Sequence, residues 1–216
     1  GSTTAWTEHG PNNVAGRTRA IMFDPNDTSN KKVWVGGVYG GLWYTLDITA
    51  ASPTWTKVND LWDNMAITTI AFNTNTFYVG TGEGWYNGDA VRGAGIWKTT
   101  DGGASWTHFF IDSPHFYYIQ KIIVHPSNGE VFAATDGPGA YGGIFKSEDG
   151  GYNWNSSLQI DNTSNWATDL ELDTDGNIYA AMSTDGIYKS TDIGANWDKV
   201  NTGSNGFPTD DFNRLE

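Results

Sequence analysis

Residues 95–106 read GIWKTTDGGASW, and this stretch decides the fold because it recurs along the chain. Residues 143–154 read GIFKSEDGGYNW and residues 186–197 read GIYKSTDIGANW, so all three keep the pattern [ST]-x-D-x-G-x-x-W after an apolar phrase. A degenerate copy with a longer turn occupies residues 41–55. The four motif aspartates follow one another at intervals of 54, 48 and 43 residues. Self-similarity at this period indicates a repeat architecture.

The chemistry of the motif predicts a tight turn between two strands. A turn aspartate accepts backbone N–H bonds, and the preceding Ser or Thr hydroxyl can tie the strand to it. Glycine permits a positive φ, and the tryptophan supplies a large apolar face for the junction between units. We therefore interpret these residues as structural, with calcium or substrate ligation by the aspartates as the alternative. The residues are Asp47, Asp101, Gly103, Trp106, Asp149, Gly151, Trp154, Asp192, Gly194 and Trp197.

Each repeat carries the signals of four short strands. Apolar or alternating runs, such as residues 119–124, precede a Gly/Asn/Pro turn and a second run such as residues 130–133. The apolar phrase of the motif and the segment that begins at its tryptophan supply the third and fourth strands. Four strands in about 50 residues predict an all-β fold made of propeller blades.

Composition excludes several classes of protein. The 216 residues include 12 Lys+Arg and 25 Asp+Glu, a formal net charge of −13, so we expect no nucleic-acid partner. The absence of cysteine excludes disulfide scaffolds and thiolate metal sites. No run of about 20 apolar residues occurs, and we expect no membrane insertion. The 14% of aromatic residues can build a large core.

The motif resembles the Asp box, or BNR repeat, of sialidases, sortilin-type receptors and xyloglucanase-like propellers. Residues 6–21 and 80–95 are similar to large secreted proteins of Bacteroidetes-type bacteria with sortilin-like propellers. The resemblance implies an Asp-box β-propeller that is extracellular, on a bacterial cell surface. The chain departs from sialidases, since Arg17 and Arg19 lie two apart on one predicted strand and Arg214 is near the end. A sialidase arginine triad is therefore not expected.

We predict one Asp-box propeller region over residues 1–216, with about four to five blades. The repeats cover approximately residues 16–58, 64–109, 117–157 and 166–200, and residues 5–10 and 207–215 belong to a shared or truncated blade. Three arrangements are open: a part of a larger propeller, a compact ring, or two chains that complete one ring. We favour an incomplete or assembling propeller, because an open edge invites pairing with another chain.

In such a blade, the loops between strands two and three share one edge with the loops between blades. Acidic and aromatic residues dominate that edge, which suits sugar rings, cationic peptides or calcium. The loop over residues 80–95 is long and glycine-rich, as functional loops often are. A buried ion network that fills the channel is the structural alternative. The candidate ligand-binding residues are Arg17, Arg19, Glu83, Trp85, Tyr86, Asp89, Arg92, His115, Asp136 and Tyr141.

We predict an extracellular binding module of a larger secreted or surface protein, with a glycan or protein ligand and no cofactor other than Ca²⁺. Self-association that completes the propeller is a second expectation. A glycoside hydrolase with xyloglucanase-like chemistry is the first alternative, and its carboxylates would be Glu83 with Asp136 or Asp89. A structural spacer propeller is the other alternative.

Overall fold

The computed structural model describes residues 17–58, 65–84, 90–111, 113–160, 166–183 and 185–200. Within these ranges the chain is all-β, with four four-stranded antiparallel sheets and one short 3-10 turn, η2 (Pro114–Phe116). The predicted blade parts at residues 5–10 and 207–215 lie outside the described residues.

Each sheet is a meander in which consecutive strands are neighbours, the arrangement of a propeller blade. The first blade consists of β1 (Thr18–Phe23), β2 (Val33–Gly37), β3 (Gly41–Thr45) and β4 (Trp55–Lys57). The second consists of β5 (Ile67–Asn73), β6 (Thr76–Thr81), β7 (Ile96–Thr99) and β8 (Thr107–Phe109). The third consists of β9 (Tyr118–Val124), β10 (Val131–Asp136), β11 (Gly142–Ser147) and β12 (Asn155–Leu158). The fourth consists of β13 (Ala167–Leu172), β14 (Ile178–Met182), β15 (Gly186–Ser190) and β16 (Asp198–Lys199).

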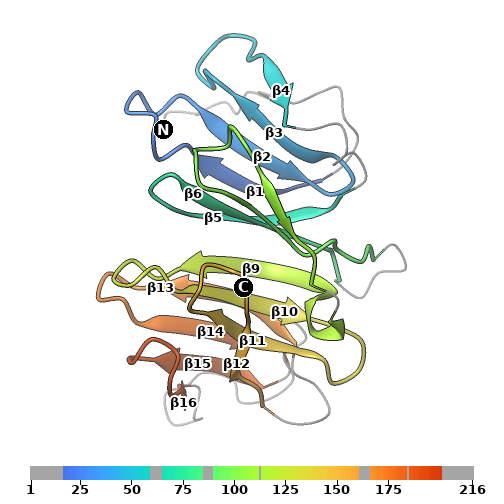
Figure 1. Ribbon diagram of the computed structural model, residues 1–216, viewed down its shortest axis with the longest axis vertical. Helices are drawn as coiled ribbons and strands as arrows, with labels where there is room; N and C mark the ends of the chain where they lie inside the picture. Colours follow the sequence, from blue (N-terminus) through green and yellow to red (C-terminus); the bar gives the residue numbers. More distant parts are fainter. Residues whose placement is uncertain are drawn as a thin grey trace, which may run out of the picture.

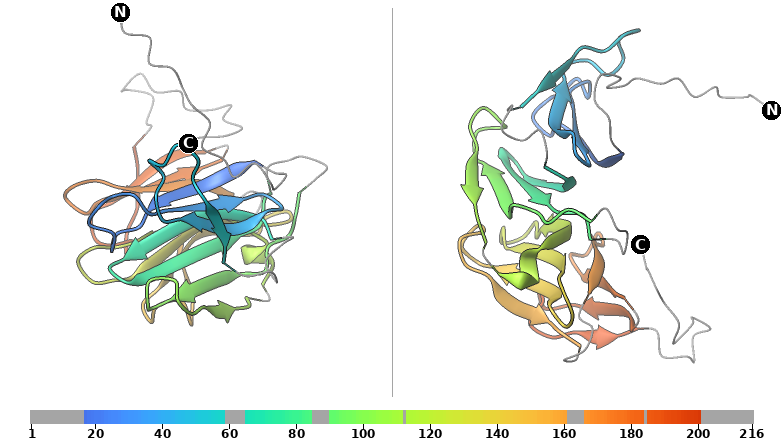
Figure 2. Two further views of the ribbon diagram at one scale, coloured as in Figure 1. Left: turned by 90° about the horizontal axis from the view of Figure 1, so that it is seen from above. Right: turned by 90° about the vertical axis from the view of Figure 1, so that its right-hand side faces the viewer.

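The blades follow one another in chain order and form an open arc (Figures 1 and 2). The first strands β1, β5, β9 and β13 lie beside one another at the axis of the arc. The predicted β-propeller fold is therefore confirmed, and the described blades do not close into a ring.

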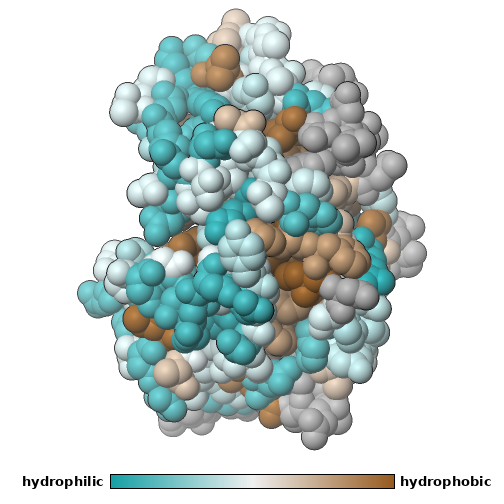
Figure 3. Space-filling model, viewed as in Figure 1, coloured by the Kyte–Doolittle hydropathy of each residue, from teal (hydrophilic) through white to brown (hydrophobic). Residues whose placement is uncertain are grey.

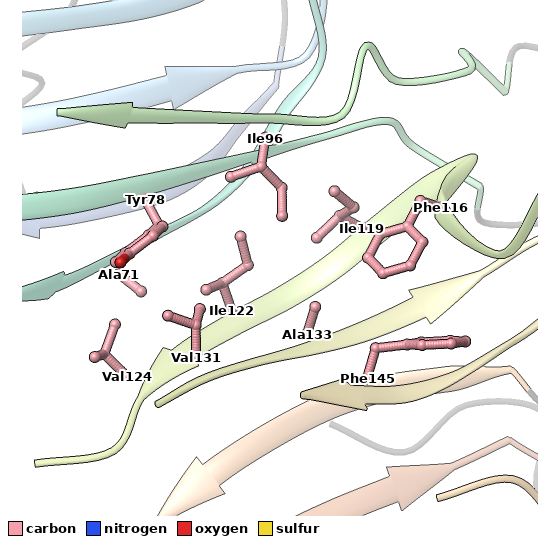
Figure 4. Packing of buried hydrophobic residues seen from close by; sticks show 10 residues of the cluster. All are labelled: Ala71, Tyr78, Ile96, Phe116, Ile119, Ile122, Val124, Val131, Ala133 and Phe145. Atoms are coloured by element: carbon pink, nitrogen blue, oxygen red, sulfur yellow. The ribbon is translucent and has the colours of Figure 1, made fainter. Parts of the chain in front are cut away.

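Three apolar clusters hold the arc together, one at each junction between blades. The junction of the second and third blades packs Tyr78 and Ile96 against Ile119, Ile122 and neighbouring residues (Figure 4). Burial of one such side chain contributes roughly 1.5–3 kcal/mol. The hydrophobic effect at these junctions, more than contacts within one sheet, therefore stabilises the arc.

The motif aspartates cap the turns between the third and fourth strands. Asp149 Oδ1 accepts the Asn153 N–H at 2.9 Å and the Ser147 hydroxyl at 2.8 Å, while Ser147 Oγ accepts the Gly151 N–H at 2.7 Å. Asp101 and Asp192 accept the equivalent bonds from Ser105 and Asn196. These bonds satisfy the turn backbone, and they hold the pKa of Asp149 and Asp192 at about 2.

The motif glycine also makes the junction between blades. Gly103 has a φ of 92°, and a Cβ there would collide with the ring of Trp34 on the preceding blade. Gly194 has a φ of 72°, and its Cβ would lie 2.5 Å from the Phe132 ring of the third blade. Trp106 lies against Trp34 with ring centroids 6.2 Å apart. The motif thus joins each blade to the one before it, a role beyond that of a turn.

Two motif copies depart from the common geometry. Asp47 accepts its bonds from Thr49 and from Lys31 Nζ, because the longer turn brings different donors to it. Trp106 and Trp154 donate to the carbonyl of the motif glycine, whereas Trp197 donates to Ser157 Oγ on the preceding blade. In the fourth blade the tryptophan therefore adds a hydrogen bond across the junction.

All four axial strands carry an irregularity at the same position. The pairing of each first strand with its second strand skips one residue, and these residues are Arg19, Thr68, Gln120 and Thr168. Such bulges re-aim a side chain and often lie near functional sites. No sequence pattern indicates them, since a bulge residue occupies an ordinary place in an alternating run.

Candidate functional site

The two edges of the arc have different loops. The described residues that connect strands two and three, and those that lead from one blade to the next, form the right-hand edge in Figure 1, which we call the loop rim. The turns with the motif aspartates form the opposite edge, the turn rim. The space-filling view shows an apolar patch on the loop-rim side, at the level of β9 and β10 (Figure 3). The predicted site residues that the structure describes lie on or beside the loop rim.

An ion pair of the loop rim joins the first two blades. Arg17 Nη2 donates to Glu83 Oε1 at 2.6 Å. The Glu83 side chain is 1% exposed, whereas that of Arg17 is 62% exposed. Glu83 Oε2 is buried and accepts no hydrogen bond from the described residues. The pair therefore presents an accessible guanidinium above a buried carboxylate that retains unused hydrogen-bonding capacity.

Backbone pairing fixes Glu83 in this position. Glu83 and Val91 exchange two N–H···O bonds of 3.0 Å, so the described arms of the loop over residues 80–95 pair as a two-stranded ribbon. Arg19, at the bulge of β1, is close enough for the charges of Glu83 and Arg17 to change its pKa. Burial lowers the pKa of Arg19, the charge of Glu83 raises it in part, and Arg17 lowers it.

The other side of this ribbon contacts the third blade. The Arg92 guanidinium lies over the Tyr117 ring, with Cζ 3.9 Å from the centroid, and Gly93 donates to the Tyr117 carbonyl at 2.8 Å. A Cβ at Gly82 would lie 2.7 Å from Gly93 N, which explains why this crossing needs glycine. Arg92 is thus placed against Tyr117 of the third blade, whereas Glu83 pairs with Arg17 of the first blade.

Aromatic side chains continue the loop rim along the third blade. The Gly142 N–H donates to His115 Nδ1 at 3.1 Å. Its ring meets Tyr141 edge-on at 4.9 Å and Phe145 at 5.1 Å between centroids. Tyr141 is 44% exposed, so an aromatic face on this rim remains open to a ligand.

Asp136, at the end of β10, is the most perturbed acid of the loop rim. Burial raises its pKa to about 7, against a weaker opposing effect of the Gly137 N–H bond. Trp166 of the fourth blade donates to the Gly137 carbonyl at 3.0 Å and covers this end of the strand. Asp136 is therefore close to half neutral near pH 7.

The structure thus groups Arg17 with Glu83, Arg92 with Tyr117, and His115 with Tyr141. Asp136 precedes Gly137, whose carbonyl accepts the hydrogen bond from Trp166. Trp85, Tyr86 and Asp89 lie outside the described residues. Tyr117 can be recognised as the partner of Arg92 only from the fold, because the two residues are on different blades.

The described residues contain neither a metal-binding cluster nor a membrane-spanning helix. Among them, no group of three or more His, Asp and Glu side chains is arranged to hold a metal ion. Calcium binding therefore stays a prediction. No helix in the described part of the chain is long and apolar enough to span a membrane.

Comparison of the fold with solved structures finds propellers. The chain matches an ancestral GH74 enzyme with a TM-score of 0.67 and 24% identity, over 92% of this chain and 26% of that one. It matches YCF48 bound to D1 peptide with a TM-score of 0.60 and 19% identity, over 89% and 57%. It matches the extracellular domain of BT4673 from B. thetaiotaomicron with a TM-score of 0.61 and 16% identity, over 95% and 25%.

These matches define the class of protein as a β-propeller, in agreement with the four blades described above. No family model and no curated protein matches the sequence. The chain spans about a quarter of the GH74 enzyme and of the BT4673 domain, and somewhat over half of YCF48. At such identities the likeness is one of fold, and the Asp-box and sortilin-like assignments remain predictions.

Proposed function

We propose that the chain is an extracellular binding module of a larger secreted or cell-surface protein, and that its loop rim binds a polysaccharide. The observation that carries this proposal is the Arg17–Glu83 pair, in which a buried carboxylate oxygen lacks a hydrogen bond from the described residues beside an exposed guanidinium. A buried acceptor without a partner costs about 1–3 kcal/mol, or more when it is charged. The buried carboxylate therefore serves to hold the exposed Arg17 guanidinium in place for a ligand.

Sugar hydroxyls fit this arrangement because each one can accept a hydrogen bond from a guanidinium. A hydroxyl group can accept from the exposed Arg17, and the exposed ring of Tyr141 suits the apolar face of a sugar ring. The matched GH74 enzyme, a glycoside hydrolase, supports a glycan over other ligands. The match to YCF48 bound to D1 peptide makes a peptide the main competing ligand.

A glycan and peptide array tests this proposal directly. We expect the protein to be retained on polysaccharides, with binding weakened about tenfold or more by Glu83→Gln, which keeps the side-chain volume and removes the carboxylate. Glu148→Gln is the matched control, since Glu148 also pairs with a cation, Lys146 at 2.8 Å, but lies on the turn rim. Retention on peptides alone would indicate that the ligand is a protein and not a glycan. No retention on any probe would favour a structural spacer.

Hydrolysis of a polysaccharide is the second candidate function, and Asp136 is the observation that favours it. A carboxylic acid with a pKa of about 7 can act as a general acid near neutral pH. Release of reducing sugar from a glycan panel, abolished by Asp136→Asn, would support hydrolysis. Absence of release from every glycan would exclude it for this chain.

A further inference from the structure

Asp136 is an acid of the loop rim that no described Lys or Arg neutralises. The sequence contains 12 Lys+Arg, and the structure describes all of them except Arg214. None of the described ones forms a salt bridge with Asp136. The causes of its shifted pKa are burial and the Gly137 N–H, and no charged group is among them. The carboxylate is therefore partly buried without a counter-charge from the described residues.

The fourth blade has an acid in a similar place that does have a counter-charge. Asp185 lies between the second and third strands of that blade, as Asp136 does at the end of the second strand of the third blade. Lys199 Nζ donates to Asp185 Oδ1 at 3.0 Å, and the Tyr188 hydroxyl donates to Asp185 Oδ2. A partly buried carboxylate that lacks such partners is costly to ionise. A cationic group of a ligand would lower this cost at Asp136.

The strand register directs the side chain of Asp136 toward the fourth blade. β10 pairs with β11 without interruption from Val131 to Asp136, so successive side chains of β10 alternate between the two faces of the sheet. Phe132 and Ala134 belong to the apolar cluster shared with the fourth blade, and Asp136 follows them on the same face. The apolar junction between the third and fourth blades thus ends in a carboxylate at the loop rim.

Two aromatic residues flank this carboxylate. Tyr118 of β9 is paired directly with Asp136, so the two side chains are on the same face of the sheet. Trp166 of the fourth blade donates from Nε1 to the Gly137 carbonyl at 3.0 Å, which holds the indole against the backbone next to Asp136. Aromatic rings attract organic cations to their faces. A carboxylate with aromatic neighbours has the composition of a site for an organic cation.

The number of acidic groups favours an organic cation over a metal ion. Calcium takes about six to eight oxygen ligands, whereas no group of three or more His, Asp and Glu side chains gathers in the described part of the chain. An ammonium group needs a single carboxylate, because water and carbonyl oxygens can accept its other N–H bonds. The formal net charge of −13 attracts cations to the chain over a longer range.

We propose that Asp136 is a subsite for a primary ammonium group, so that the polysaccharide bound by the loop rim contains amino sugars with free amines. This inference rests on the proposed binding function and specifies its ligand. Such a polysaccharide offers hydroxyls to the exposed Arg17 and an ammonium to Asp136. A carboxylate that holds an ammonium stays ionised and cannot donate a proton, so this role is an alternative to that of Asp136 as the general acid of a hydrolase.

Oligomers of glucosamine and of N-acetylglucosamine test the proposal, since they differ only at the nitrogen. In titration calorimetry near neutral pH, we expect the wild-type protein to bind the glucosamine oligomer about tenfold or more tightly than the acetylated oligomer. Asp136→Asn should remove this preference and keep the affinity for the acetylated oligomer, which also shows that the variant is folded. Asp185→Asn is the matched control and should keep the preference, because Asp185 already pairs with Lys199.

The possible outcomes separate this inference from the binding function on which it rests. Equal affinity of the wild-type protein for both oligomers, or a preference that survives Asp136→Asn, would overturn the ammonium subsite. Binding of neither oligomer by a protein that is retained on other polysaccharides would overturn the subsite and leave the binding function in place. Tighter binding of a lysine tripeptide than of the glucosamine oligomer would overturn the amino sugar as the ligand. No retention on any glycan would overturn both proposals.

Discussion

The turn rim and the loop rim of this propeller differ in how much they repeat. On the turn rim, Asp101, Asp149 and Asp192 accept almost the same set of hydrogen bonds in three successive blades. On the loop rim, each junction has its own chemistry: an ion pair at Glu83, a cation–π contact at Arg92 and a buried acid at Asp136.

This difference separates two requirements on the sequence. The turn must join each blade to the preceding one, so the same residues solve the same packing problem each time. The loop rim does not have to meet this packing requirement. Side chains with a shifted pKa or an unsatisfied hydrogen bond therefore persist there, although they lower the stability of the fold. We hypothesise that one rim serves structure and the other serves binding, and each experiment below can refute or refine this division.

The largest expected effect is on the turn rim. Gly103→Ala should lower the free energy of unfolding by about 2–5 kcal/mol, since it adds strain at positive φ and a collision with Trp34. Gly139→Ala is the matched control. Gly139 has a φ of 67°, but no atom lies within 4 Å of the place that an alanine Cβ would occupy, so it isolates the strain alone, about 1–2 kcal/mol. Equal losses in urea unfolding would contradict a junction role for Gly103.

A smaller effect, of opposite sign, is expected on the loop rim. The raised pKa of Asp136 means that the folded state binds a proton more tightly than the unfolded state. Stability therefore falls as the pH rises from about 4 to about 7. Asp136→Asn should stabilise the protein at pH 8 by on the order of 2 kcal/mol, after a discount for partial exposure, and hardly at pH 4. A pH-independent effect would argue against a buried acid.

The third prediction concerns the acid limit of the turn rim. The pKa of Asp149, lowered to about 2 by backbone and side-chain hydrogen bonds, contributes stability above pH 4 that is lost as the pH falls toward 2. Asp149→Asn should lower the thermal midpoint modestly at pH 7 and flatten its decline in acid. Glu148→Gln, an adjacent exposed substitution, should leave that decline unchanged. A parallel decline in wild type and Asp149→Asn would contradict the assignment.

The sequence determines much of this fold and little of its site. Repeated residues such as Trp154 and Gly194 predict blades, because the same local chemistry recurs at a fixed period. The partner of Arg92 could not be predicted, since Tyr117 reaches it from another blade. The bulge at Gln120 could not be predicted either, because an extra residue in a strand leaves no mark on the composition of the sequence.

The most direct test measures ligand affinity and thermal midpoint together for variants of both rims. Glu83→Gln and Arg92→Ala should lose affinity for the polysaccharide that retains the wild-type protein, without lowering the midpoint. Gly103→Ala and Asp149→Asn should lower the midpoint and keep the affinity when assayed well below it. Loss of affinity in the folded turn-rim variants, or full affinity in both loop-rim variants, would contradict the division of the propeller into a structural rim and a binding rim.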